Sequence, residues 1–392
     1  KDNAERLASE ALAKFGHLPH GEDIEKDALD PKNYISGQAV DHYHRYKEDL
    51  ALAKSLGHNA YRFSIEWSRI EPEEGKFDEK EIEHYRDVIK TCHENGLEPF
   101  VTLWHWTDPI WIGVSGAWKD KNTVDYFLRY ADTIMREYKD IVQFWMPFNE
   151  PSTEVSYGYL RGKQPPGFKS KLIANKAYKN LMMAQREVYH LAKTISSNFQ
   201  IGCSHFMYYR MPADNFFWNI IATKILDYFS DTRFLNVFRD SCDFLGVQYY
   251  QPFFVQVKTG GSLLGIIENQ KQIELCSDLD WQVLPEGIYH VVKKAAQLGK
   301  PIYITENGIA DAKDDRRGDY IRDHLKYLNK AINEGVDIRG YFHWSLLDNF
   351  EFVDMRGYWP KFGLIEIDRK TQERKIRPSA YTYKKIIEDS SL

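Results

Sequence analysis

Apolar and polar positions follow two different periods along this chain, and from about residue 49 the two alternate. Short apolar runs that end in polar residues, such as residues 99–106 and 301–306, are typical of buried strands. Between such runs, apolar residues recur at helical spacing. In residues 78–92, Asp78 can cap the helix and Glu81 follows three residues later. Helices that alternate with fully buried strands predict a parallel sheet.

The pattern predicts seven strands and a barrel. The strands are expected at residues 59–65, 99–106, 143–150, 201–206, 243–250, 301–306 and 340–346. Helices are expected at residues 49–56, 78–92, 124–138, 286–298 and 319–333. A (β/α)8 TIM barrel of the α/β class needs eight strands, and no first strand is identifiable in residues 1–40, where we expect a short helix at 4–15 and then a polar loop. Without a linker or a shift in composition, we predict a single barrel domain over residues 1–392.

Composition excludes several other classes of protein. The 392 residues carry a net charge of −5, and the 52 basic and 57 acidic residues are mixed along the chain, so no nucleic-acid partner is expected. No run of about 18 apolar residues could span a bilayer, and no signal peptide opens the chain. The four cysteines lack CxxC spacing, which favours reduced thiols and a cytoplasmic protein.

Two glutamates carry the candidate chemistry. Glu150 and Glu306 each end an apolar strand-like run, and the carboxyl ends of barrel strands meet at one mouth. Two carboxyl groups that face each other there can cleave a glycosidic bond. Each glutamate lies next to an asparagine (Asn149, Asn307) whose amide can bind a sugar hydroxyl, and Arg62 could keep a neighbouring carboxylate ionised. One such glutamate alone is more often a surface or ion-pair residue, but the matching contexts favour a glycosidase.

The motifs around these residues resemble glycoside hydrolase family 1, the β-glucosidase-like enzymes. The resemblance covers about residues 36–385 and rests on residues 61–70 (YRFSIEWSRI), 102–106 (TLWHW), 149–151 (NEP), 243–250 (DFLGVQYY), 304–308 (ITENG), 344–351 (WSLLDNFE) and 361–363 (KFG). It implies a retaining exo-β-glycosidase of β-glucosides, and β-galactosides or β-fucosides remain open as substrates.

The resemblance also implies roles. Glu306 would be the nucleophile that forms a covalent glycosyl–enzyme, and Glu150 would protonate the leaving oxygen and then activate water. Tyr250 would hydrogen-bond Glu306, and Asn149 would hold the sugar's 2-hydroxyl. The sequence alone does not say which glutamate has which role.

The expected sugar-binding set is completed by residues of three other motifs. His105, Trp344 and Glu351 would form the sugar subsite, and Trp106 and Phe352 would lie beside it. A carboxylate can accept two hydroxyl hydrogens, and an indole offers a stacking face. The simpler interpretations are that His105 is a hydrogen-bonded core histidine, that Trp344 packs in the core, and that Glu351 is a solvated loop acid.

Three positions and the first strand depart from the family pattern. Gln248 stands where Asn is usual, Phe352 where Trp usually follows the glutamate, and Ser152 where many members have Trp. Phe352 loses an indole N–H donor. The family's first strand, with a Gln that grips the 3- and 4-hydroxyls, is not found.

Neither a metal nor a cofactor is expected. His42 and His44 lie two residues apart, and such residues on a helix do not face the same way. No phosphate loop or nicotinamide fingerprint appears. The alternatives that stay open are a catalytically impaired sugar-binding barrel, a 6-phospho-β-glycosidase, which the charge of Glu351 disfavours, and glycosyl transfer to an alcohol. The oligomeric state is not predicted.

Overall fold

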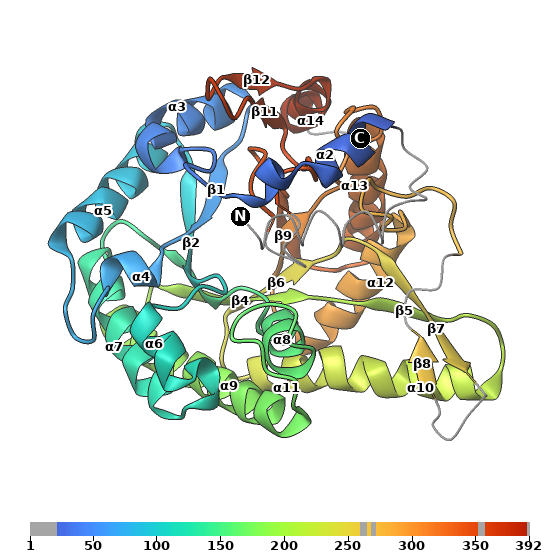
Figure 1. The fold of residues 1–392 in the computed structure, drawn as a ribbon, viewed down its shortest axis with the longest axis horizontal. Coiled ribbons are helices and arrows are strands. Elements are labelled where there is room, and N and C mark those ends of the chain that lie inside the picture. The colour runs from blue at the N-terminus through green and yellow to red at the C-terminus, as the bar shows by residue number, and fades with distance from the viewer. Residues whose placement is uncertain (1–21, 259–264, 268–271, 352–356, 390–392) are drawn as a thin grey trace.

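The core of the molecule is a curved sheet of parallel strands inside a ring of helices (Figure 1). The structure is a computed structural model that describes residues 22–258, 265–267, 272–351 and 357–389. The strands are β1 (Ala60–Ser64), β2 (Glu98–Trp104), β3 (Phe144–Phe148), β4 (Gln200–Phe206), β6 (Phe244–Gln248), β9 (Ile302–Asn307) and β10 (Ile338–His343). They form one seven-stranded sheet in the order β1-β2-β3-β4-β6-β9-β10. The predicted α/β barrel is confirmed, with seven of the eight strands of a closed barrel.

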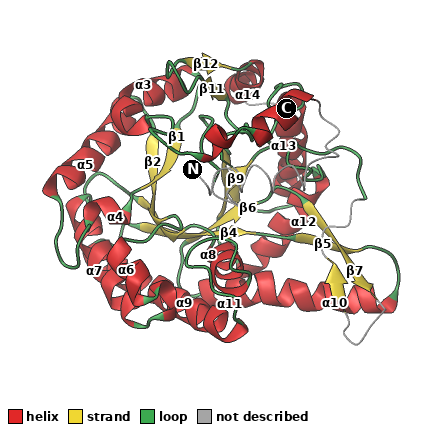
Figure 2. Ribbon diagram, viewed as in Figure 1, coloured by secondary structure: helices red, strands yellow, loops and turns green. Residues whose placement is uncertain are grey.

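Helices connect successive strands and pack outside the sheet (Figure 2). Those in or next to the βα repeat are α3 (His42–Ser55), α5 (Glu79–Glu94), α7 (Asn122–Glu137), α9 (Lys171–Ile195), α12 (Glu286–Ala295), α13 (Arg317–Asn333) and α14 (Pro378–Asp389). Shorter helices are α2 (Glu22–Leu29), α4 (Trp67–Ile70), α6 (Ile110–Ser115), α8 (Pro151–Glu154), α10 (Phe217–Asp227) and α11 (Arg233–Phe238), with 3₁₀ or π turns at Pro31–Tyr34, Ala117–Lys119, Val155–Leu160, Tyr228–Thr232 and Ala296–Leu298.

Each predicted strand and helix that falls on described residues overlaps an observed one. The expected polar loop before residue 40 is wrong in part, since α2 lies there, and the helix expected at residues 4–15 lies outside the described residues. The sequence analysis missed α9, α10, α11 and α14. It also missed two small sheets, formed by β5 (Tyr209–Pro212), β7 (Pro252–Lys258) and β8 (Gly265–Ile267), and by β11 (Ile365–Ile367) and β12 (Arg374–Ile376).

Helix α5 shows how the local sequence sets an element. The Asp78 side chain accepts hydrogen bonds from the backbone N–H groups of Lys80 (2.9 Å) and Glu81 (3.4 Å), which satisfies two donors at the helix start. Behind the helix, Gly96 takes a left-handed φ of 66°, a conformation that glycine adopts without strain. The predicted cap is therefore confirmed.

Aromatic rings fill the barrel interior below the strand ends. They come from five different strands: Phe100, Phe144, Phe244, Tyr303 and Phe342. The Phe100 and Phe144 rings stack with centroids 4.2 Å apart. Strand β4 contributes Gly202 beside this layer, and a Cβ there would lie 2.2 Å from the Phe244 ring. The layer packs the interior, so any site must lie at the carboxyl ends above it.

The barrel is open along one line, which we call the seam: the gap between β1 and β10. Among the described residues, β1 pairs only with β2 and β10 only with β9. Residues of β1 and β10 are half-buried or exposed, whereas all five residues of β6 are buried. A cavity of about 560 Å³ lies along the seam, with residues of both edge strands in its wall.

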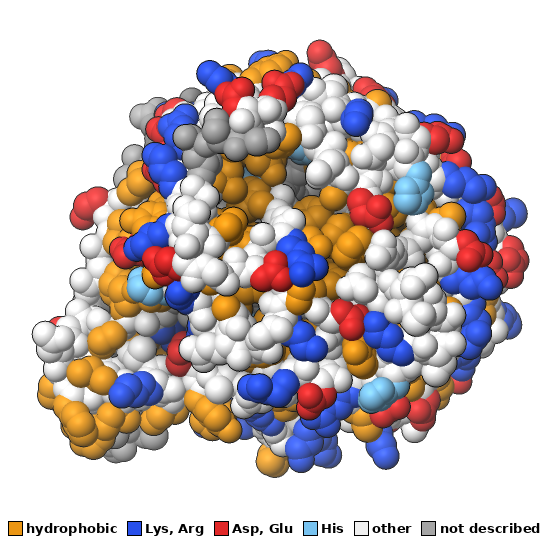
Figure 3. All heavy atoms as spheres, turned by 180° about the vertical axis from the view of Figure 1, so that it is seen from behind, with side chains coloured by type: hydrophobic (Ala, Val, Ile, Leu, Met, Phe, Trp, Pro, Cys, Tyr) orange, Lys and Arg blue, Asp and Glu red, His pale blue; other side chains and the backbone are white. Residues whose placement is uncertain are grey.

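Helix α10 presents apolar side chains to solvent. Phe217 (63% exposed), Trp218 (50%) and Ile225 (49%) lie on its outer side, while Asn219 and Ala222 are buried. From behind, hydrophobic side chains gather at the corner of the molecule where α10 begins (Figure 3). Within the described part of the chain, no helix combines the length and the hydropathy that crossing a bilayer requires.

Candidate active site

Glu150 lies just beyond the end of β3, in a turn held by the neighbouring strands. Its backbone N–H donates to the Ser204 carbonyl (3.1 Å), and the N–H of Asn149 donates to the Trp104 carbonyl (2.9 Å). Glu150 has a φ of 40°, in the left-handed region that non-glycine residues seldom occupy, and Pro151 then starts α8. Hydrogen bonds from β2 and β4 thus fix a turn that aims a buried carboxyl inward.

Glu306, near the end of β9, is held by two donors on its two oxygens. The guanidinium of Arg62 in β1 donates to Oε1 (2.6 Å), and the Tyr250 hydroxyl donates to Oε2 (2.7 Å). The side chains of Arg62 and Glu306 are 7% and 6% exposed. A cation and a hydroxyl donor therefore hold the two oxygens of this buried carboxyl group in place.

Asn149 links the two glutamates. Its Oδ1 accepts hydrogen bonds from Arg62 Nη2 and from Gln248 Nε2, the latter at 2.9 Å. Its Nδ2 lies 3.0 Å from His105 Nε2. Burial, and then the charge of Arg62, lowers the pKa of His105 to about 3, so this imidazole is neutral and can accept the bond.

Electrostatics separate the two glutamates. Burial, followed by the negative charge of Glu306, raises the pKa of Glu150 well above its usual range. Glu150 is therefore shifted toward its protonated form, while Glu306 is paired with a cation. Carboxyl groups in such different environments are suited to act as an acid and a nucleophile.

The remaining predicted residues lie on the seam side of this cluster. The Trp344 ring is 6.2 Å from the His105 ring, and Trp106 donates from Nε1 to the Asn149 carbonyl (3.0 Å). Burial raises the pKa of Glu351 to about 8, although Trp344 and Asn349 hydrogen-bond it. Oε1 of Glu351 has no partner among the described residues. Phe352 lies outside the described residues.

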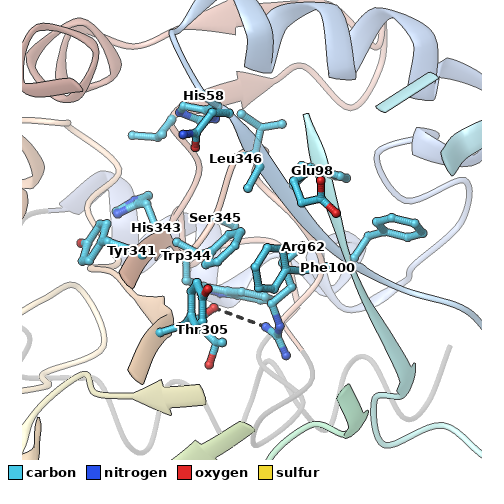
Figure 4. Close-up of a pocket in the computed structure, with 18 of the residues that line it drawn as sticks. His58, Arg62, Glu98, Phe100, Thr305, Tyr341, His343, Trp344, Ser345 and Leu346 are labelled. Atoms are coloured by element: carbon cyan, nitrogen blue, oxygen red, sulfur yellow. Dashed lines mark hydrogen bonds between the residues drawn. The ribbon is translucent and has the colours of Figure 1, made fainter. Parts of the chain in front are cut away.

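The seam cavity reaches this cluster. Arg62, His105 and Trp344 belong to its wall. Figure 4 shows Arg62 linked to Thr305 across the interior, with Tyr341, His343 and Trp344 on the opposite side from Phe100. The candidate site is therefore open toward the seam.

The fold explains why the motif at residues 304–308 (ITENG) ends in a glycine. A Cβ on Gly308 would lie 1.8 Å from the Trp344 carbonyl oxygen, so no other residue fits at this position. The contact brings the end of β9 against the chain that leaves β10. It places Glu306 and Trp344 on adjoining walls.

Comparison with known proteins identifies the family. The sequence profile of Glycosyl hydrolase family 1 matches residues 23–238 and 224–391. The chain belongs to glycosyl hydrolase family 1.

Relatives and solved structures agree with this assignment. β-Glucosidase A of Thermotoga maritima is 32% identical over an alignment of 404 positions, gaps included, which covers 92% of this chain and 90% of the relative. A 6-phospho-β-galactosidase of Clostridium acetobutylicum is 32% identical over an alignment of 426 positions, which covers 92% of this chain and 90% of that relative. The β-glycosidase from Pyrococcus horikoshii superposes with a TM-score of 0.85 at 34% identity, covering 96% of this chain and 88% of that one.

The structure brings together every expected family 1 site residue that it describes: Arg62, His105, Trp106, Asn149, Glu150, Tyr250, Glu306, Trp344 and Glu351. Sequence reasoning named Gln248 only as a departure and missed its contact with Asn149. Ser152 is buried, with Oγ 3.3 Å from His205 Nδ1.

No group of three or more His, Cys, Asp or Glu side chains in the described ranges could hold a metal. His42 Nδ1 lies 2.8 Å from Asp49, and His44 Nδ1 lies 2.6 Å from Asp41. Each histidine thus has a carboxylate partner of its own.

Proposed function

We propose that this chain is a retaining exo-β-glycosidase acting on β-glucosides, with Glu306 as nucleophile and Glu150 as acid and base. The observation that carries the proposal is the contrast between the two carboxyl groups. Glu306 receives hydrogen bonds from Arg62 and Tyr250, whereas the pKa of Glu150 is raised by burial and by the charge of Glu306. Membership of glycosyl hydrolase family 1 supports these roles.

The arrangement accounts for both steps of a retaining mechanism. In the first step, a Glu306 oxygen bonds to the anomeric carbon while Glu150 gives its proton to the departing oxygen. The charge of Glu306 is then lost in the ester, which removes one cause of the raised pKa of Glu150. In the second step, Glu150 takes a proton from water, the water oxygen bonds to the anomeric carbon, and Glu306 leaves as a carboxylate.

The substrate subsite is proposed from the seam-side residues. The Asn149 amide would donate to the 2-hydroxyl, and His105 would bind an adjacent hydroxyl. Trp344 would supply a stacking face, with Glu351 accepting hydroxyl hydrogens beyond it. Phe352 remains a prediction, and β-galactosides or β-fucosides are further candidate substrates.

A second candidate function is hydrolysis of 6-phospho-β-galactosides. Several curated relatives at 31–32% identity carry that name, so sequence similarity alone does not separate the two substrates. The side chain of Glu351 distinguishes between the unphosphorylated and the 6-phosphorylated substrate. Its carboxyl is buried beside Trp344, and a phosphate placed there would meet an acid rather than a cation. We therefore favour the unphosphorylated sugar.

We also propose a cytoplasmic location. The four cysteines are buried thiols outside any disulfide, which a reducing compartment explains.

The test is release of 4-nitrophenol from 4-nitrophenyl β-glucoside and from the 6-phospho-β-galactoside. Turnover of the first alone, lost in Glu306→Gln, is the expected result. Turnover of the phosphorylated substrate alone would favour the second function. A folded protein that turns over neither would overturn both and leave a sugar-binding barrel.

A further inference from the structure

Gln248 is buried beside the catalytic cluster but contacts neither glutamate side chain. It ends β6, and its side-chain Nε2 donates to Asn149 Oδ1 at 2.9 Å. The two residues are 99 positions apart in the sequence and lie on strands separated by β4. Gln248 is 0% exposed. An interior glutamine at this place must be explained by what it does to Asn149.

The hydrogen bonds of Asn149 leave its carboxamide one orientation. Arg62 and Gln248 both present N–H donors to Oδ1, and a guanidinium has no acceptor. A flipped amide would place its NH₂ group against these donors. The observed orientation directs Nδ2 toward His105 and leaves its second hydrogen for a ligand.

Gln248 acts on Asn149 more selectively than Arg62 does. Arg62 also donates to Glu306, so a change there disturbs the nucleophile as well. Gln248 has a further feature: its Oε1 is buried and has no partner among the described residues. An unpaired buried acceptor is destabilising, and an apolar side chain of the same shape would avoid it. Packing alone does not explain a glutamine here.

We infer that Gln248 is a positioning residue that holds the Asn149 amide as a donor to the sugar's 2-hydroxyl, and thereby sets the preference for substrates that carry this hydroxyl. The inference rests on the proposed function. Because contacts to the 2-hydroxyl form with the bound sugar and strengthen in the transition state, the loss is expected in both KM and kcat.

The test compares 4-nitrophenyl β-glucoside with its 2-deoxy analogue in the wild type, Gln248→Met and Gln248→Glu. Met keeps the shape without donor or acceptor, and Glu keeps the acceptors without the donor. For both variants we expect kcat/KM on the glucoside to fall about tenfold or more, and that on the 2-deoxy sugar less than threefold. The ratio of kcat/KM on the glucoside to kcat/KM on the 2-deoxy analogue therefore shrinks in both variants.

Thr305→Val is the matched control. Thr305 is 1% exposed, precedes Glu306 in β9, and its hydroxyl has no partner in the described structure. Its removal should leave the substrate ratio unchanged. A parallel fall on both substrates in Gln248→Met would assign Gln248 to packing and overturn the inference, as would an unchanged ratio.

A binding experiment separates this inference from the proposed function. D-glucose and 2-deoxy-D-glucose are titrated into the wild type and Gln248→Met, with tryptophan fluorescence as the signal. A preference for glucose that is lost in the variant supports the role of Gln248 even if the chain hydrolyses nothing. An equal preference in both proteins contradicts it whatever the hydrolysis assay shows.

Discussion

Replacing Arg62 by Met would remove a cation that joins both halves of the catalytic cluster. Arg62 donates to Glu306 Oε1 at 2.6 Å and to Asn149, and its side chain is only 7% exposed. Methionine has a similar length and no charge. Within the described residues, the change would leave the buried Glu306 carboxyl group without its ion-pair partner, and Oδ1 of Asn149 with Gln248 as its remaining side-chain donor.

The size of the effect follows from this burial. Removing one partner of a buried ion pair costs about 3–5 kcal/mol. That cost is shared between folding and catalysis, because the folded enzyme can relieve it by protonating the nucleophile. If two-thirds of it falls on the transition state, kcat/KM drops about 30- to 300-fold, at 1.36 kcal/mol per factor of ten. The remainder lowers the melting temperature.

The assay is steady-state hydrolysis of 4-nitrophenyl β-glucoside, alongside thermal unfolding followed by circular dichroism. Arg62→Lys is the control that keeps the charge. One ammonium group cannot reproduce the two contacts that the guanidinium makes with Glu306 and Asn149. We therefore expect Arg62→Lys to retain more kcat/KM than Arg62→Met but less than the wild type. An Arg62→Met enzyme that is folded and within threefold of the wild type would refute the reasoning.

Three other predictions follow from the site and the seam. Glu150→Ala should lose about 10²–10⁴-fold in kcat on methyl β-glucoside, but far less on 2,4-dinitrophenyl β-glucoside, whose leaving group needs no proton; equal losses would argue against Glu150 as the acid. Burial raises the pKa of Glu351 from 4.5 to about 8, so between these pH values the folded state binds a proton that the unfolded state does not, and stability falls as the pH rises. The Glu351→Gln variant should therefore unfold at a higher temperature than the wild type, by a margin that grows from pH 5 to pH 8. The margin should be absent if the carboxyl group ionises normally. In hydrogen exchange followed by mass spectrometry, the backbone amides of β1 and β10 should exchange faster than those of β6, because in the described structure each of these two strands is paired on one edge only. Equal protection of all three strands would mean that the seam is closed in solution.

The fold could be predicted from the sequence where one strand carries its own signal. Every strand of the barrel is a short apolar run, and its polar residues follow at the carboxyl end, as in Phe148-Asn149-Glu150. Such a local pattern predicts that the carboxylates share a mouth. It does not determine which residue donates to which.

Long-range contacts were not predictable. Gln248 and Asn149 are 99 residues apart, and Arg62 and Glu306 are 244 apart. Nothing in either local sequence shows that strands that are not neighbours in the sheet will bring these side chains together. The parallel pairing of β5 with β7 has the same cause, because the two short strands are separated by about 40 residues and a helix.

Helix α9 is a different case, because its signal was present. Over Lys171–Ile195, small and apolar residues recur at helical spacing, and Ala177, Leu181 and Val188 are buried against the barrel. The Ser170 side chain accepts from the Ile173 N–H as an N-cap. The helix was missed in a stretch rich in Lys and Asn.

The open seam weakens one part of the site more than the other. Glu150 follows β3 and Glu306 lies on β9, and the continuous ladder β3-β4-β6-β9 joins them on the side away from the seam. Their relative position therefore depends on strands that are paired on both edges. His105 and Trp344, in contrast, lie in the wall of the seam cavity, where β10 has a free edge. The open seam should thus raise KM for the sugar more than it lowers kcat.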